Sequence, residues 1–311
     1  WVAGLKPGWQ KARMENFNTL TSGGIVEEDL IQDGWTEIIR NLISMANYRG
    51  KGLQRSEIAE MIELADFQKM EQVRARAQEI VNDPDVAESL KPYYRQFCKR
   101  PCFHDDYLPT FNRDNVHLID TDGKGIDEIS ERGIVANGKL VELDCIIFAT
   151  GFEVGTDYTR RSGYDVIGKG GLKLSNKWAD GMKSLHGLHT RGFPNLFIIS
   201  NAQAAFTTNF PHAMDESAQH IGYIVNQCLS GNISTIEPSE EAEEAWVQEI
   251  ISLARLSESY QAACTPGYYN NEGKPNPRSI QNASYGKGPN PFFKRMKSWR
   301  EEGGMQGLEL G

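Results

Sequence analysis

The sequence predicts an α/β fold with a helical N-terminal segment. Two observations carry this prediction. Apolar residues recur at helical spacing through much of the first third of the chain, and two later apolar runs are unbroken, as in strands buried on both faces of a parallel sheet. A chain of 311 residues is long enough for one large domain or two ordinary ones.

The first third is predicted to be helical. After a turn at residues 5–9, the stretch 27–46 repeats apolar residues at helical spacing, and Gly50 breaks the pattern. A longer amphipathic helix follows from about residue 58. It should end near Pro84, which cannot continue a helix in progress.

Short strands are predicted beyond a proline-punctuated, loop-rich segment that starts near residue 91. Asn137-Gly138 favours a tight hairpin turn, and the last of these strands is unbroken in its apolar character and ends at Thr150-Gly151. A second unbroken run, Asn195–Ser200, has the same character. The strands predicted around the hairpin are Val116–Ile119, Gly133–Ala136, Leu140–Leu143 and Cys145–Ala149.

Two further helices and a coil complete the chain. One helix should begin near Pro211, since proline is tolerated at the first helical position, and end near Gly231. Another should run from Ser239 to about Gln261, with acidic residues in its first turn that complement the helix dipole. The tail from Thr265 is rich in glycine, proline and asparagine and is expected to be extended coil.

This set of elements does not form a self-sufficient sheet. The two buried strands lack obvious parallel neighbours, because the first third supplies helices and the middle supplies mainly a hairpin. The chain is therefore expected to depend on strands that lie outside it.

Composition excludes several classes of function. Hydrophobic residues make up 39% and charged residues 24%, which is typical of a soluble globular protein, and the net charge of −9 argues against a nucleic-acid partner. No apolar run reaches the roughly 18 residues of a membrane span. The first ten residues carry no signal-peptide pattern.

The cysteines favour a reducing compartment. There are five, scattered along the chain, which suits a cytoplasmic protein better than a disulfide framework. Cys98, Cys102 and His104 lie close enough in sequence to suggest zinc. A structural zinc site needs a fourth ligand, however, and usually a second clustered pair, so no metal site is expected.

A set of ordered motifs resembles the Baeyer–Villiger type of class B flavoprotein monooxygenase. The motifs are KRPCFHDDYLPTFNRDNVHLID, LDCIIFATGFE, GFPNLFIIS and TNFPH, and the resemblance covers most of residues 81–275. Lys-Arg-Pro followed by a strand ending in FATGF discriminates better than any single glycine motif. The helical N-terminal segment and the TPGYYNNEGKP tail are most similar to members that take bulky cyclic or polycyclic ketones.

The resemblance implies the C-terminal part of interleaved FAD- and NADP-binding Rossmann-like domains. Residues 1–148 would end the NADP-binding domain, 149–263 would complete the FAD-binding domain, and 264–311 would be an extended cofactor-covering loop and tail. The chain contains no G-x-G-x-x-G loop, which places a pyrophosphate at a helix N-terminus. The implied partner is an N-terminal half that carries those loops, and the implied cofactors are FAD and NADPH.

Arg100, in Lys99-Arg100-Pro101, matches the family's active-site arginine. Oxygen transfer from O2 to a ketone carbonyl passes through negatively charged species in a poorly solvated pocket. A fixed guanidinium stabilises such charge, and losing one group of this kind typically costs about 3–4 kcal/mol in the barrier. Lys99 matches a position that contacts the 2′-phosphate of NADP.

Other positions match the family's cofactor contacts. Thr150 and Gly151 match its ATG element, where a glycine lets the backbone approach a ligand. Asn209, Phe210 and Pro211 precede a helix whose free N–H groups would face the anionic edge of the flavin. Phe210 stands where well-known relatives carry methionine.

The tail loop also matches the family. Asn270 and Lys274 fall in the loop that closes over NADP, and Thr265 stands near the position where relatives often bear tryptophan.

Three functions remain open on sequence grounds. The first is ketone oxygenation to an ester or lactone, together with the N-terminal half. The second is N- or S-oxygenation on a shared scaffold, whose known members lack the arginine of Lys99-Arg100-Pro101 in this context. The third is a non-catalytic fragment.

Overall fold

The computed structural model describes residues 2–48, 55–152, 157–254, 262–267, 270, 273 and 277–311. The chain divides into two compact units. The first unit comprises Trp1–Ile58 and Gly155–Gly311, and the second comprises Ala59–Val154.

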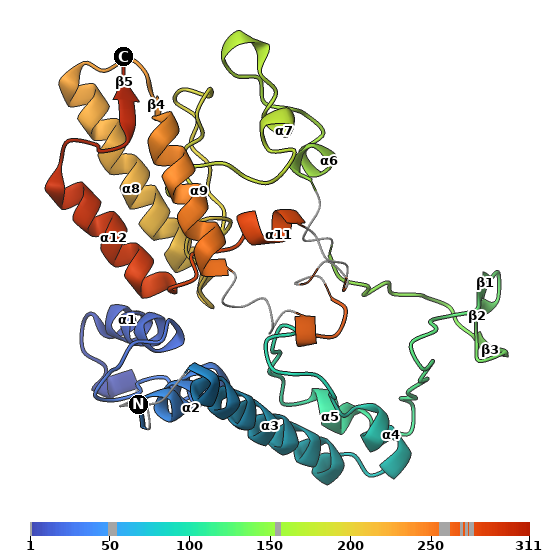
Figure 1. The fold of residues 1–311 in the computed structure, drawn as a ribbon. Helices are drawn as coiled ribbons and strands as arrows, with labels where there is room; N and C mark the ends of the chain where they lie inside the picture. The colour runs from blue at the N-terminus through green and yellow to red at the C-terminus, as the bar shows by residue number, and fades with distance from the viewer. Residues whose placement is uncertain are drawn as a thin grey trace. The chain divides into compact units, whose positions relative to one another are not determined.

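The first unit is mainly helical, and α8 and α12 pack side by side in it (Figure 1). Two short strands, β4 (Ile236–Pro238) and β5 (Leu308–Leu310), pair antiparallel and fix the end of the chain against the residues after α8. Its helical elements are η1 (Val2–Gly4), α1 (Trp9–Thr21), α2 (Gly34–Tyr48), α6 (Tyr158–Ser162), η2 (Lys169–Gly171), α7 (Leu174–Lys177), α8 (Phe210–Gly231), α9 (Glu240–Ala254), α11 (Pro277–Gln281) and α12 (Pro289–Glu302).

The second unit holds one long helix and a small antiparallel sheet. Strand β2 is central, and it pairs with β3 in the register Ala136↔Lys139. The turn residues Asn137 and Gly138 have φ values of 51° and 71°, so the predicted hairpin over this dipeptide is confirmed. The elements are α3 (Arg55–Ile80), α4 (Pro84–Ser89), α5 (Tyr107–Thr110), β1 (Glu128–Ser130), β2 (Gly133–Ala136) and β3 (Lys139–Glu142).

The helix ends follow local chemistry. Helix α3 stops before Pro84, which opens α4, and the Asp83 carboxylate caps α4 by accepting from the backbone N–H groups of Asp85 and Val86 at 2.9 and 3.2 Å. Helix α8 begins at Phe210 and ends at Gly231, as predicted.

The predicted buried strands are not formed by the described residues. Residues 145–149 are irregular, with Ile147 86% and Phe148 67% exposed, and residues 116–119 and 195–200 are irregular as well. A strand exists only where a neighbour accepts its N–H groups, and the described residues provide no parallel neighbour for these runs. The prediction of strands at these residues was wrong, because apolar composition alone does not supply the neighbour that a strand needs.

The predictions for the two ends of the chain were incomplete. The tail was expected to be extended coil, yet residues 277–281 and 289–302 are helical, and Pro289 opens α12 at its first position. Helix α1 was not predicted. Its N-cap is Gly8, which makes no side-chain capping bond and therefore leaves little signal in the sequence.

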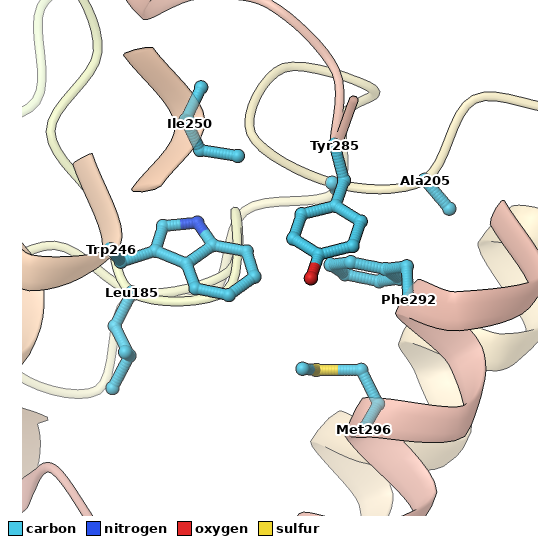
Figure 2. Packing of buried hydrophobic residues seen from close by; sticks show 8 residues of the cluster. Leu185, Ala205, Trp246, Ile250, Tyr285, Phe292 and Met296 are labelled. Atoms are coloured by element: carbon cyan, nitrogen blue, oxygen red, sulfur yellow. The ribbon is translucent and has the colours of Figure 1, made fainter. Parts of the chain in front are cut away.

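The main core of the first unit is aromatic (Figure 2). The ring of Trp246 in α9 stacks on that of Tyr285, with centroids 5.6 Å apart and an interplanar angle of 4°. Phe292 and Met296 of α12 close the cluster with Leu185. Aromatic residues bury large areas and gain further from such pairing, so the misassigned tail contributes directly to the core.

Three buried histidines adjoin this core. The His186 ring lies 5.0 Å from that of Trp246 and 5.7 Å from that of His220, between ring centroids. Burial lowers the pKa of His189 to about 4. It lowers that of His220 to about 3, helped by the positive charge of Arg300, and it depresses the pKa of His186 well below the usual value. The Nε2 atoms of His189 and His220 are buried and have no hydrogen-bond partner among the described residues.

The oxidation states of the cysteines and the character of the helices relate to two further expectations, a reducing compartment and the absence of a membrane span. Cys102, Cys145 and Cys228 are free thiols, whereas Cys98 and Cys264 are disulfide-bonded, which was not expected from the sequence. Among the described residues, no helix combines the length and apolar character that crossing a membrane requires.

Because the pKa values of three buried histidines are lowered, we expect the first unit to be less stable in acid. Because these bases have lowered pKa values in the folded state and about 6.5 when unfolded, their stability contribution is complete above pH 6.5 and is lost as the pH falls toward 4. At pH 5 the loss is about 2 kcal/mol for each of His189 and His220. Urea unfolding followed by tryptophan fluorescence at pH 7 and pH 5 measures it. His220→Gln should reduce the loss, whereas exposed His117→Gln should not, and equal losses in all three proteins would contradict the assignment.

Candidate active site

Helix α3 holds the segment that carries Lys99 and Arg100. The Arg74 guanidinium donates to the backbone oxygen of Pro92 at 2.9 Å and lies 5.3 Å from the centre of the Tyr93 ring. One turn further along the helix, Gln78 accepts from the Lys91 ammonium at 3.1 Å. These contacts bind an otherwise irregular segment to a rigid helix.

A buried carboxylate strengthens this attachment. Asp66 of α3 is 4% exposed, and its Oδ1 accepts from the backbone N–H of Gln96 at 2.7 Å. Its Oδ2 faces Nε of Arg95 at 3.4 Å. Burial raises the pKa of Asp66, against the opposing effects of the Gln96 hydrogen bond and the Arg95 charge.

Arg100 is exposed, and its guanidinium makes no hydrogen bond or ion pair within the part of the chain that the structure describes. Its backbone oxygen faces the Cys102 thiol at 3.6 Å, a weak contact. Lys99 is half-buried. Arg100 is therefore a cation on a well-anchored segment, and its guanidinium has no ion-pair partner among the described residues.

Thr150 and Gly151 lie in the irregular, exposed stretch after residue 149. Gly151 has a φ of 89°, a left-handed conformation that glycine adopts without strain, and a Cβ there would meet no atom of the described chain within 4 Å. The backbone at this position accordingly has open space beside it, which fits a close approach by a ligand.

The N-terminus of α8 carries the next predicted positions. Asn209 is the N-cap residue, but its side chain makes no capping bond; instead its Nδ2 donates to Oδ1 of Asn18 in α1 at 2.8 Å. Phe210 and Pro211 are exposed. The start of a 22-residue helix with no side-chain cap offers backbone N–H groups and a partial positive charge, which suit the anionic edge of a flavin.

Asn270 organises the loop in which it lies. Its Oδ1 accepts from the backbone N–H groups of Gly267 and Gly273 at 2.9 and 3.1 Å, and its Nδ2 donates to the backbone oxygens of Cys264 and Thr265. Its predicted contact with NADP stays a prediction. Lys274 lies outside the described residues.

The predicted residues divide between the two units. Lys99, Arg100, Thr150 and Gly151 belong to the second unit, and Asn209, Phe210, Pro211 and Asn270 belong to the first. No cluster of histidine, cysteine or acidic side chains suited to a metal occurs among the described residues. His104 Nδ1 instead accepts from the backbone N–H of Asp106 at 3.0 Å.

Sequence reasoning missed the anchoring residues Asn18, Asp66 and Arg74. One signal for Asp66 was available, because it lies four residues after Ile62 and four before Met70, on the apolar side of the long helix. A buried carboxylate requires a partner. The partner Gln96 lies 30 positions further along the chain, and no local sequence pattern identifies it.

Known proteins resemble this chain in both sequence and structure. No protein-family model matches the chain. It is 49% identical along its whole length to a pentalenolactone D synthase of Streptomyces exfoliatus, covering 54% of that protein, and 42% identical to a Baeyer–Villiger monooxygenase of Stachybotrys chlorohalonatus, covering 50%. Along its whole length the chain is similar to Baeyer–Villiger monooxygenases.

Solved structures agree with this family. A polycyclic ketone monooxygenase from Thermothelomyces thermophila superposes on 99% of the chain with a TM-score of 0.86 and 34% identity, and the match covers 51% of that enzyme. A complex of OTEMO with FAD and NADP gives a TM-score of 0.60 at 25% identity, over 79% of this chain and 45% of that one. The fold class predicted from sequence, part of a Rossmann-type flavoprotein, is confirmed.

The Baeyer–Villiger relatives are longer than the chain. The chain spans about half the length of the curated relatives that it matches. This fact agrees with the expectation that its apolar runs pair with strands outside it.

Asn270 offers a test of the loop described above. Replacing it by alanine removes the oxygen that accepts two hydrogen bonds and the amide nitrogen that donates two, so the amides of Gly267 and Gly273 should exchange with solvent about tenfold faster, equivalent to roughly 1.4 kcal/mol of local stability. Hydrogen exchange followed by mass spectrometry measures this. Thr265→Ala, which leaves the backbone acceptor in place, is the control, and unchanged exchange in Asn270→Ala would show that the side chain does not organise the loop.

Proposed function

We propose that the protein containing this chain is an FAD- and NADPH-dependent monooxygenase that converts a ketone to an ester or lactone. In the balanced reaction, ketone, O2, NADPH and a proton give ester, water and NADP+. One oxygen atom enters the carbon–carbon bond beside the carbonyl, and the other leaves as water. The single observation that carries this proposal is the exposed Arg100 guanidinium, held on a segment fastened to α3 and without an internal counter-ion among the described residues.

The proposed role of Arg100 follows from charge. When bound, FAD and NADPH supply the reducing power and the oxygen chemistry. The guanidinium contributes a positive charge where negative charge develops on the way to the ester, and a preorganised charge needs no rearrangement at the moment of reaction. Lys99, the adjacent residue, is proposed to contact the 2′-phosphate of NADPH.

The other proposed cofactor positions each have a physical reason. Gly151 leaves room for a close approach by a cofactor, with Thr150 beside it. The backbone N–H groups at the start of α8 suit an anionic flavin edge, and Asn209, Phe210 and Pro211 shape that end of the helix. Asn270 and Lys274 are proposed for the NADP side.

The proposed partners are an N-terminal half that bears the glycine-rich nucleotide loops, a bulky cyclic ketone, and O2. The ketone class is supported by the similarity to a polycyclic ketone monooxygenase. The proposed compartment is the cytoplasm. N- or S-oxygenation and a non-catalytic role are the alternatives, and Arg100 favours the ketone reaction over both.

The test is substitution of Arg100 in the full-length enzyme. Arg100→Ala should lower the rate of ester formation by about a hundredfold or more, the usual effect of removing one group that stabilises transition-state charge. Product formation from a panel of small and large ketones and NADPH oxidation are both measured. Arg76→Ala, an exposed arginine of α3, is the matched control. Ester formation at the wild-type rate in Arg100→Ala would overturn the assigned role.

A further inference from the structure

A strained turn immediately precedes the Lys99-Arg100 pair. The backbone N–H of Cys98 donates to the backbone oxygen of Arg95 at 3.2 Å, which closes the turn. Within it Phe97 has a φ of 59°, in the left-handed region that residues with a Cβ rarely adopt. Such a conformation persists only where the surroundings over-determine it, and it is often found at functional sites.

The group that holds this turn is the carboxylate of Asp66. It binds the backbone N–H of Gln96 at 2.7 Å, one residue before the strained position, and it faces Nε of Arg95 at 3.4 Å. Glu63, one turn earlier on α3, lies 3.6 Å from Nη1 of Arg95. The Asp66 side chain is 5% exposed, so a substitution that removes its acceptor atoms deletes a buried hydrogen bond to the backbone N–H of Gln96.

We propose that Asp66 is a positioning residue for Arg100. The hydrogen bond to Gln96 fixes the backbone four residues before Arg100 against the side of α3. A displacement of about 1 Å at a reacting group can cost about a hundredfold in rate. The inference rests on the proposed function, because it assigns to Asp66 the placement of the charge that Arg100 supplies.

A purely structural role for Asp66 would give a different experimental result from a positioning role. If Asp66 only stabilised the fold, its replacement would lower the amount of active enzyme but leave the yield of each turnover unchanged. If it positions Arg100, folded enzyme would use NADPH without oxygenating the ketone. In that unproductive turnover NADPH, O2 and a proton give NADP+ and hydrogen peroxide. The ratio of ester to peroxide formed per NADPH separates the two roles, because it does not depend on the enzyme concentration.

The experiment compares Asp66→Leu and Asp66→Asn with wild type in the full-length enzyme. The enzymes are first reduced with dithiothreitol so that the disulfide at Cys98 does not act as a second anchor, and the reductant, which consumes peroxide, is removed before the assay. Ester, peroxide and NADPH are then measured at saturating ketone and NADPH. Thermal unfolding establishes that each variant is folded. Glu79→Gln is the matched control, since it removes an exposed charge from the same helix.

Ester formation should decrease in the order wild type, Asp66→Asn, Asp66→Leu. Asp66→Leu, which cannot accept a hydrogen bond, should form ester about a hundredfold more slowly and release most of its oxygen as peroxide. Asp66→Asn keeps an acceptor for Gln96 but loses the charge beside Arg95, and should fall between Asp66→Leu and wild type. If Asp66→Leu yields no folded protein, the ratio of ester to peroxide in Asp66→Asn alone tests the proposal. A wild-type ratio of ester to peroxide in folded Asp66→Asn and Asp66→Leu would overturn the proposal.

Arg100→Ala, assayed alongside, distinguishes failure of the role proposed for Asp66 from failure of the role proposed for Arg100. Loss of ester formation in Arg100→Ala together with normal product yield in the Asp66 variants would reject the positioning role alone. Normal ester formation in Arg100→Ala would reject the proposed role of Arg100 itself, and with it the reason for positioning that residue.

Discussion

Backbone hydrogen bonding between strands is the constraint on which this structure depends. Residues 145–149 and 195–200 have the apolar composition of buried strands, but no parallel neighbour is provided by the described residues, and Ile147 and Phe148 are exposed to solvent. An exposed apolar run such as residues 145–149 is able to pair with strands of other chains. The chain spans about half of its Baeyer–Villiger relatives, and we propose that the remaining half supplies the neighbours.

The two units are stabilised by contacts between side chains rather than by a large sheet. The first unit is built on the stacked Trp246 and Tyr285 and on three buried histidines. In the second unit, α3 binds the segment before Arg100 through Arg74 and Asp66. In both, rigid helices fix irregular segments, and these irregular segments carry most of the residues for which we propose a function.

The sequence predicted the elements whose signals are local. The long helix α3, the start and end of α8 and the Asn137-Gly138 hairpin each follow from periodicity, a proline or a turn dipeptide. Non-local features were not predicted. The tail was interpreted as coil because it is rich in glycine, proline and asparagine, although Pro289 opens α12 and Phe292 packs in the core. Its helices are stabilised by tertiary contacts that composition does not reveal.

The same division holds for the candidate site. Lys99-Arg100-Pro101 was recognised as a contiguous motif, whereas the acceptor that holds the preceding turn comes from Asp66, 30 residues before Gln96. Asn209 was recognised from its place before α8, but its partner Asn18 is 191 residues away. Motifs identify the residues that perform chemistry, and only the fold identifies the residues that hold them.

The most direct test of the central claim is the flavin content of the purified chain, alone and after co-expression with the half that bears the glycine-rich loops. The account predicts that the chain alone carries no flavin absorbance and that FAD is bound in a one-to-one ratio once both halves are present. A chain that binds FAD stoichiometrically by itself would contradict the claim, because the nucleotide site would then be complete within these 311 residues.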